Sequence, residues 1–165
     1  MKSLNACIII WLLASVFGCS APEKTIYHDV TFDYDVAVDF TQIKTYNWVK
    51  MPATSRIDEF NQIRIKDAVN TKLKSLGLRI KIDQPDVFLV MYGGGYKAVD
   101  MSVMMDYAVY DVGRLKLAMY DAQSHNEIWW AESRADLFFE MTPAQKEEVI
   151  DNSVQRILEY YPPGP

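Results

Sequence analysis

Hydrophobic and polar side chains alternate along residues 28–40, the most regular pattern in the first third of the chain. Phe32 and Val36 fall on one parity, whereas aspartates such as Asp33 fall on the other. A period of two is typical of a strand with one buried and one solvated face. We therefore predict a strand over 28–40. A second strand is predicted over 43–49, where β-branched and aromatic residues concentrate.

Two segments carry apolar residues at helical spacing. The first predicts a helix over 56–76, with Asp58 in a capping position and Gly77 as its C-terminal stop. The second helix begins after Thr142, because a proline follows this threonine and Gln145 stands where a capping box needs a glutamine. A pair of prolines ends the second helix.

The remaining segments predict further strands. Residues 87–92 are apolar on both parities, which favours a central strand covered on both faces. Glycines 93–95 are expected to end that strand, and residues 96–113 fit neither period. Residues 114–120 and 128–138 alternate on either side of a turn and predict a hairpin. This order of elements predicts a single α+β domain, with a mainly antiparallel sheet and two helices packed on one face.

The N-terminus has the form of a bacterial lipoprotein signal. An apolar stretch over 6–17 follows the positive charge of Lys2, and the small residue Gly18 directly precedes Cys19. We predict cleavage between Gly18 and Cys19, and attachment of acyl chains such as palmitate to Cys19. The chain then divides into a signal peptide that is removed (1–18), a lipidated cysteine with a short tether (19–27) and a single domain (28–163).

The N-terminus has two alternative interpretations. An uncleaved anchor helix is disfavoured because the apolar stretch is about a dozen residues, and roughly 20 are needed to span a bilayer. An ordinary signal peptide cut near Ala21 would leave Cys19 without a role. Ser20 follows the cysteine where an aspartate would retain a protein in the inner membrane under enterobacterial-type sorting. We therefore expect the inner leaflet of the outer membrane, with the domain facing the periplasm.

Charge and cysteine content narrow the function classes. The formal net charge of the whole chain is −5, and removal of residues 1–18 takes away Lys2 but no acidic residue. An acidic domain argues against nucleic acid as a partner. The two cysteines are Cys7, in the signal, and Cys19. No cysteine is then left for a disulfide, a zinc site or a thiol nucleophile.

Several segments together resemble a family of bacterial lipoproteins, domain of unknown function 4136. They are the lipobox, the run Lys44-Thr45-Tyr46-Asn47-Trp48 after Asp39-Phe40, the strand from Pro85 to Val90, and the Leu115–Trp130 hairpin with a final helix ending in Tyr161-Pro162-Pro163. The resemblance implies an exported, lipid-anchored α+β domain. It implies no reaction and no functional residues.

The residues that could support catalysis or metal binding are scattered. Asp29, Asp33 and Asp35 share one parity. Residues two apart lie about 6.5–7 Å apart along a strand, so these carboxylates could share a calcium ion only with help from loops. The sequence contains no calcium-binding loop motif. We expect a solvated strand edge there. His28 and His125 are the only histidines and have no ligand spacing. The glycine run lacks the lysine of a phosphate loop. We therefore expect no catalytic residue, metal or cofactor.

Aromatic and methionine residues are the better candidates for a binding surface. Trp129 and Trp130 must point to opposite faces of their strand, so one belongs to the core. The other, near Trp48 or Tyr120, would form an aromatic shelf for a sugar or a partner. Methionine repacks easily, which suggests an adaptable surface in the segment that fits neither period. The candidate surface comprises Trp130, Tyr96, Met104, Met105, Tyr107 and Tyr110.

These observations favour a non-enzymatic binding or assembly module. Its expected partners are the membrane, through the N-terminal lipid, and an envelope protein. One alternative is a small-molecule or lipid-binding accessory of an envelope transport system. A hydrolase with an unrecognised site is a further, weaker alternative.

Overall fold

The computed structural model describes residues 26–27, 29–51, 57–100, 108–137 and 141–163. The predicted signal peptide, Gly18, Cys19 and the tether up to residue 25 therefore lie outside the described residues, as do Met104, Met105 and Tyr107.

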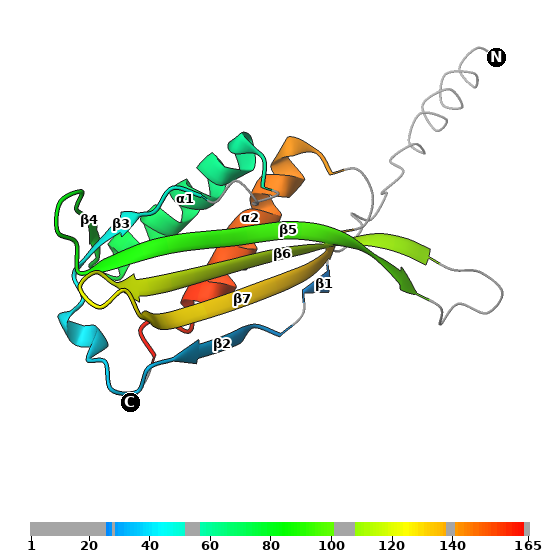
Figure 1. Ribbon diagram of the computed structural model, residues 1–165. Helices are drawn as coiled ribbons and strands as arrows, with labels where there is room; N and C mark the ends of the chain where they lie inside the picture. The colour runs from blue at the N-terminus through cyan, green and yellow to red at the C-terminus, as the bar shows by residue number, and fades with distance from the viewer. Residues whose placement is uncertain (1–25, 28, 52–56, 101–107, 138–140, 164–165) are drawn as a thin grey trace, which may run out of the picture.

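One sheet organises the fold (Figure 1). Its strand order is β1-β7-β6-β5-β3-β4, and β2 pairs with β7 along the same edge as β1. The strands are β1 (Ile26–Tyr27), β2 (Thr31–Tyr34), β3 (Thr45–Trp48), β4 (Arg79–Ile80), β5 (Val87–Asp100), β6 (Ala108–Asp121) and β7 (Glu127–Leu137).

The sheet is mixed, and the prediction of a mainly antiparallel sheet needs this correction. Strands β5, β6 and β7 form an antiparallel meander, whereas β3 runs parallel to both β4 and β5. The physical reason is the helix between β3 and β4: a helical crossover returns the chain in the same direction and so produces parallel neighbours. The predicted α+β class and the single domain are confirmed.

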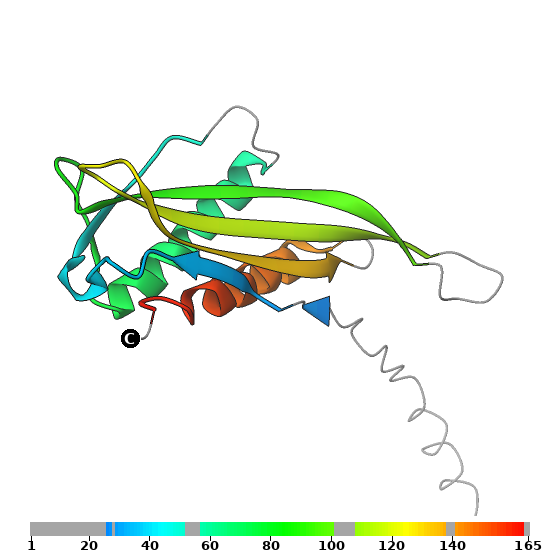
Figure 2. The same cartoon turned by 60° about the horizontal axis from the view of Figure 1, so that its bottom comes forward.

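Both helices, α1 (Glu59–Ser75) and α2 (Pro143–Leu158), lie on one face of the sheet (Figures 1 and 2). The Asp58 side chain caps α1 by accepting a hydrogen bond from the Asn61 amide, so α1 begins three residues later than predicted. Gly77, with φ at 89°, ends α1 as predicted. The predicted capping box of α2 is present, with Thr142 and Gln145 bonded reciprocally.

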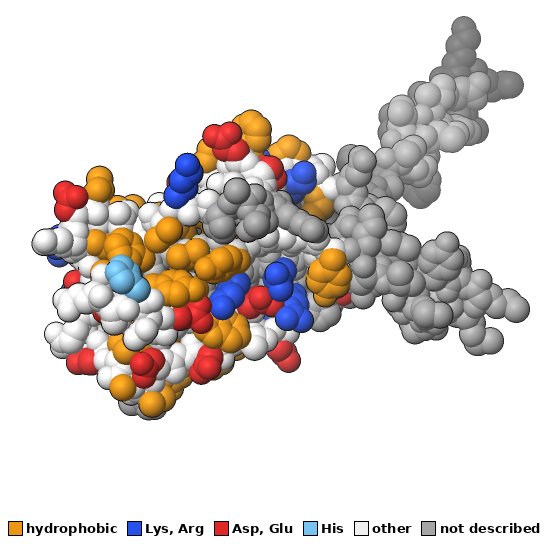
Figure 3. All heavy atoms as spheres, viewed as in Figure 1, with side chains coloured by type: hydrophobic (Ala, Val, Ile, Leu, Met, Phe, Trp, Pro, Cys, Tyr) orange, Lys and Arg blue, Asp and Glu red, His pale blue; other side chains and the backbone are white. Residues whose placement is uncertain are grey.

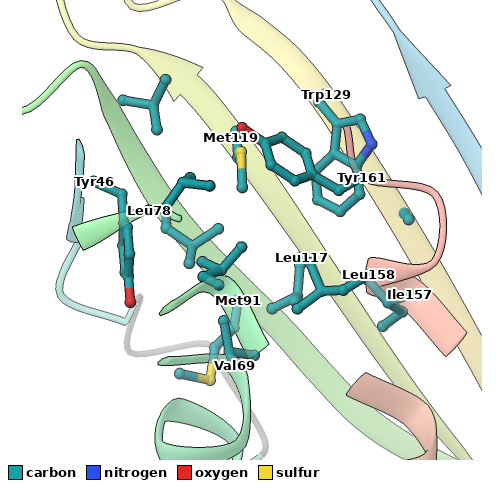
Figure 4. Packing of buried hydrophobic residues seen from close by; sticks show 14 of the residues in the cluster. Tyr46, Val69, Leu78, Met91, Leu117, Met119, Trp129, Ile157, Leu158 and Tyr161 are labelled. Atoms are coloured by element: carbon teal, nitrogen blue, oxygen red, sulfur yellow. The ribbon is translucent and has the colours of Figure 1, made fainter. Parts of the chain in front are cut away.

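The core fills the space between this helix layer and the sheet (Figure 4). Val69 and Leu73 of α1, with Ile157 and Leu158 of α2, face Leu89, Met91, Leu117, Met119 and Trp129 of the sheet. The Trp129 indole donates to the Tyr160 carbonyl at 3.0 Å, so Trp129 is the core member of the tryptophan pair. Among the described residues, every buried or partly buried member of the core lies between Val30 and Tyr161.

The strand predicted over 28–40 is wrong in its second half. Strand β2 ends at Tyr34, after which Asp35 accepts a hydrogen bond from the Ala37 amide and turns the chain. Phe32 is 40% and Val36 86% exposed, whereas Val30, Tyr34, Val38 and Phe40 pack in or against the core, so the predicted buried face forms only in part. Aspartate side chains that bond to nearby backbone amides compete with sheet pairing. Here that local competition prevails over the alternating pattern.

The prediction that glycines 93–95 end a strand is also wrong. Strand β5 passes through them to Asp100 and pairs with β6 over its whole length. A Cβ at position 93 would overlap the Ile57 side chain and lie 2.7 Å from its Cγ1. Glycine there permits a close approach. Beyond Asp111 of β6 the two strands continue as a ribbon past the rest of the sheet (Figure 2).

Candidate binding site

Side chains on the helix-facing side of the sheet change in size along the strands. At one end this side carries Leu89, Met91, Leu117, Met119 and Trp129, which are fully buried. At the other end the same parity carries Gly93, Gly95, Gly113, Ser133 and Ala135. The register places Gly95 opposite Gly113, and Gly113 opposite Ala135. Apart from Leu115, which lies opposite Gly93 and Ser133, the three neighbouring strands present only small side chains to the helices at this end.

A cavity of about 250 Å³ lies above this floor of small residues. The sheet contributes Gly94, Gly95, Gly113, Arg114, Leu115, Ser133 and Ala135, and the helix side contributes Ile57, Asp58, Asn61, Ile65, Val149, Ile150 and Ser153. The lining is predominantly apolar, with a few polar groups, as is typical of small-molecule sites. Large side chains would fill this space, so the small residues of the floor are its cause.

Two buried hydroxyls belong to the lining. Ser133 on β7 is 1% exposed, and Ser153 on α2, from the helix side, is 7% exposed. The Oγ of Ser133 has no hydrogen-bond partner among the residues that the structure describes. A buried hydroxyl without a partner costs roughly 1–3 kcal/mol. Ser133 therefore carries an unused hydrogen-bonding capacity at an apolar site.

Polar side chains are held together at the α1 end of the cavity. Asn61 donates to the Asp58 carboxylate through its backbone amide, at 3.0 Å, and through its side chain, at 2.6 Å. Arg64 in turn donates to Asn61 Oδ1 at 2.9 Å. These bonds fix the first turn of α1 and give the cavity one polar wall.

The opposite side of the sheet carries an aromatic surface. We call Phe88, Tyr92, Tyr120 and Trp130 the outer aromatic surface, and Figure 3 shows hydrophobic side chains gathered over β5–β7 on this face. Lys116 Nζ lies 4.4 Å from the Trp130 ring centroid. Tyr120 donates to Glu127 at 2.9 Å, and its hydroxyl is 3.4 Å from that of Tyr92. Polar contacts thus hold Tyr92 and Tyr120 at their hydroxyls and Trp130 at its ring face, and Phe88 stacks on the His125 ring.

Of the residues predicted to form one binding surface, the structure describes the side chains of Trp130 and Tyr96. Trp130 belongs with Tyr120 on the outer face, whereas Trp48 lies on the helix side, where its indole donates to Asn70 of α1. Tyr96 is 54% exposed and projects from β5 beyond the outer aromatic surface. Tyr110 is part of β6, but its side chain is not described. The proposed role of these residues in binding remains a prediction.

The aspartates predicted to lie on one strand face have other partners. Asp33 accepts from the Tyr34 amide and Asp35 from the Ala37 amide. Within the described ranges, no three His, Cys, Asp or Glu side chains are grouped so that they could hold a metal ion. In the same part of the chain, no helix is long and apolar enough to cross a membrane.

Ionisable groups with shifted pKa values stabilise the fold rather than line the cavity. Burial raises the pKa of Asp86, but hydrogen bonds from Lys44 and Thr45 outweigh this and the net pKa is lowered. Hydrogen bonds from Thr41 lower the pKa of Asp39, and those from Ser124 lower that of Asp121. Burial raises the pKa of Tyr46 to about 12 and also raises the pKa values of Tyr120 and Tyr161.

The run Lys44-Thr45-Tyr46-Asn47-Trp48, which suggested the family, has a structural role. The Asp86 carboxylate accepts from the Lys44 and Thr45 amides at 2.8 Å, and Thr45 Oγ1 accepts from the Asp86 amide at 3.0 Å. Tyr46 and Trp48 both donate to Asn70 Oδ1. One short strand is thereby bonded to the start of β5 on one side and to α1 on the other.

The family model for a domain of unknown function, DUF4136, matches residues 30–163. The chain belongs to the DUF4136 family. The match covers every strand and helix described here except β1. DUF4136 assigns no activity, so the roles of individual residues must come from this structure. The comparison with curated proteins gave no match.

Solved structures share the fold at low sequence identity. A PDZ domain protein from Parabacteroides distasonis matches with a TM-score of 0.61 and 14% identity over 86% of this chain, which spans only 37% of that protein. A PelC dodecamer from Paraburkholderia phytofirmans matches with a TM-score of 0.54 and 12% identity, covering 81% of this chain and 95% of that one. At such identities these matches show the fold alone.

A minor lipoprotein from Acinetobacter baumannii is similar at a TM-score of 0.47 and 15% identity, covering 71% of this chain and 91% of the other.

Sequence reasoning missed the cavity. The sequence does carry a signal for the cavity. Positions 93, 95, 113, 133 and 135, which face the helices from three neighbouring strands, are all glycine, serine or alanine. That signal becomes visible only when the strand register is known.

Proposed function

We propose that this DUF4136 protein is an envelope lipoprotein, anchored through Cys19 in the outer membrane and facing the periplasm, that acts by binding and not by catalysis. The lipobox supports the anchor. The binding role rests on one observation, the cavity between the helix layer and the small-residue floor of the sheet. This favours a small-molecule or lipid-binding accessory over a purely structural envelope protein.

The position of β1 relates the anchor to the cavity. Ile26 pairs with Asp136 of β7, and the adjacent Ala135 lines the cavity. The tether, residues 20–25, reaches roughly 20–25 Å at no more than about 3.5 Å per residue. A lipid on Cys19 would hold the cavity end of the domain close to the membrane, where apolar molecules concentrate.

Labelling with radioactive palmitate tests the anchor. The wild-type protein should incorporate the label and fractionate with membranes. Cys19→Ala should lose the label, whereas Cys7→Ala, inside the predicted signal peptide, should keep it. A wild-type protein without label, or Cys19→Ala labelled as strongly as wild type, would show that Cys19 is not the lipidation site.

Titration with naphthalene, followed by its fluorescence, tests the binding site. The chain starting at Ser20 keeps every core residue that the structure describes, and a cooperative thermal transition should be established first. Ala135→Leu places three more carbon atoms in the cavity and should abolish binding. Ala37→Leu makes the same substitution in an exposed turn and should bind as the wild type does. Equal binding by the two variants would contradict the cavity as the site.

Self-assembly is a second candidate function, favoured by the outer aromatic surface. No helix of the described chain covers this face of the sheet. The PelC protein of similar fold was solved as a dodecamer, so the occupant proposed here is a second copy of this chain. Sedimentation of the wild type should then show an oligomer that Trp130→Ser dissociates. A wild type that sediments as a monomer at all concentrations excludes this candidate.

A further inference from the structure

We infer that the cavity takes a compact, flat apolar ligand of roughly ten carbon atoms with one hydrogen-bonding group, and that Ser133 recognises this group. The inference rests on the proposed binding function and specifies its ligand class. It is drawn from three properties of the cavity: its volume, its floor and its hydroxyls.

The volume sets the size of the ligand. An engineered apolar cavity of about 150 Å³ in another protein holds benzene, which has six carbon atoms. The cavity between the helices and the sheet measures about 250 Å³. Scaling by volume gives roughly ten carbon atoms. A fused two-ring system has this size, whereas a complete long acyl chain would extend outside the cavity.

The floor sets the shape of the ligand. Gly95 and Gly113 are directly opposite each other on β5 and β6, and Ala135 continues the row on β7. Glycine lets another group approach the backbone closely because it has no Cβ. A flat ring can therefore lie against the peptide planes, while Ile57, Val149 and Ile150 contact its other side. A branched or bulky ligand would make poorer use of such a floor.

The hydroxyls set the polarity of the ligand. Ser133 is 1% exposed, and its Oγ has no hydrogen-bond partner within the described part of the chain. A serine hydroxyl can donate one hydrogen bond and accept two. A ligand with one hydroxyl or amino group would satisfy Ser133, whereas a pure hydrocarbon leaves it unpaired. The cavity should therefore prefer the polar member of a pair of otherwise equal ligands.

Naphthalene and 1-naphthol form such a pair, because they differ by one hydroxyl group. Both would be titrated into the chain starting at Ser20, with fluorescence as the readout. Wild type should bind 1-naphthol about five to ten times more tightly than naphthalene, the effect of one hydrogen bond to a buried partner. Ser133→Ala should lose this preference and bind naphthalene at least as tightly as 1-naphthol, because the buried naphthol hydroxyl then has no partner. Ser124→Ala, in the exposed turn between β6 and β7 and outside the cavity lining, is the matched control and should keep the preference.

The outcomes separate this inference from the proposed function. Equal affinities for the two compounds in wild type, or a preference that survives in Ser133→Ala, would overturn the role of Ser133 and leave the binding function intact. A preference lost equally in Ser124→Ala would also overturn the assignment to Ser133. If wild type binds neither compound, the inference and the binding function of the cavity both fail. Calorimetry on the same variants would exclude changes in quantum yield as the cause of a fluorescence difference.

Discussion

Replacing Asn70 tests how β3 is attached to the helix layer. Asn70 Oδ1 accepts hydrogen bonds from the Tyr46 hydroxyl and from the Trp48 indole, each at 2.9 Å. Tyr46 is 1% exposed, so water cannot replace its partner, whereas Trp48 is only partly buried. Asn70→Ala removes the shared acceptor and leaves both donors in place.

The expected loss follows from these two donors. A buried donor without a partner costs roughly 1–3 kcal/mol, and the indole, which water can reach, should cost less. Alanine has a higher helix propensity than asparagine, so the substitution also stabilises α1 by about 0.5 kcal/mol and offsets part of the loss. We expect the free energy of unfolding to fall by about 2–3 kcal/mol. For a domain of this length the melting temperature should fall by roughly 6–12 °C.

Urea denaturation of the chain starting at Ser20 would measure this loss. Asn70→Asp keeps an acceptor oxygen and should lose less than half as much stability as Asn70→Ala. Thr71→Ala is the matched control, because Thr71 is the next residue of α1 and is exposed. Its free energy of unfolding should stay within about 0.5 kcal/mol of wild type.

A double-mutant cycle with Tyr46→Phe provides the sharpest test. Once Asn70 is alanine, removing the Tyr46 hydroxyl should cost nothing or even restore stability, because the unpaired donor is gone. Independent, additive losses for the two substitutions would refute the shared-acceptor argument. A loss below about 0.5 kcal/mol for Asn70→Ala would refute it as well.

Three further predictions concern other parts of the fold. The pKa of Asp86 is lower in the folded protein than its ordinary value of 3.8, so its contribution to stability is present above pH 3.8 and is lost as the pH falls through the folded-state pKa. Asp86→Asn should weaken this acid dependence in unfolding curves measured at several pH values. An acid dependence equal to that of wild type would contradict the role of Asp86. Gly93→Ala should displace Ile57 and lower the free energy of unfolding by about 1–3 kcal/mol in urea, so wild-type stability would disprove the close packing. Amide hydrogens of Ala98–Asp100, whose partners in β6 do not pair with β7, should exchange faster than those of Val87–Leu89, which lie between β3 and β6. Equal protection would show that the ribbon is as stable as the central sheet.

Sequence patterns predicted the elements whose signals are local. The capping box at Thr142, the glycine stop at position 77 and the hairpin between β6 and β7 are confirmed because each depends on neighbours within a few residues. The strand over 28–40 failed at Asp35, where a local side-chain bond to the Ala37 amide turns the chain. Alternation alone does not reveal which aspartate will form a turn.

Features that depend on distant contacts could not be predicted. The three consecutive glycines looked like a strand end, because nothing near them in sequence shows that Ile57 packs over Gly93. The parallel pairing of β3 with β5 joins segments that are separated by α1. The cavity combines residues from β5, β6, β7 and both helices. Of the candidate surface, Trp130 could be placed on a strand face, but its neighbours became known only from the strand register.

The pairing of β1 and β2 with β7 has a consequence for the order in which the protein is made. The first two strands find their hydrogen-bond partner only in the last one, with most of the chain between them. When the chain is synthesised or exported with its N-terminus first, β1 and β2 have no partner strand until β7 emerges. Pairings over such sequence distances form slowly, and strand edges left open attract other chains. Strands β1 and β2 are therefore the described part of the nascent chain with the greatest need of a chaperone.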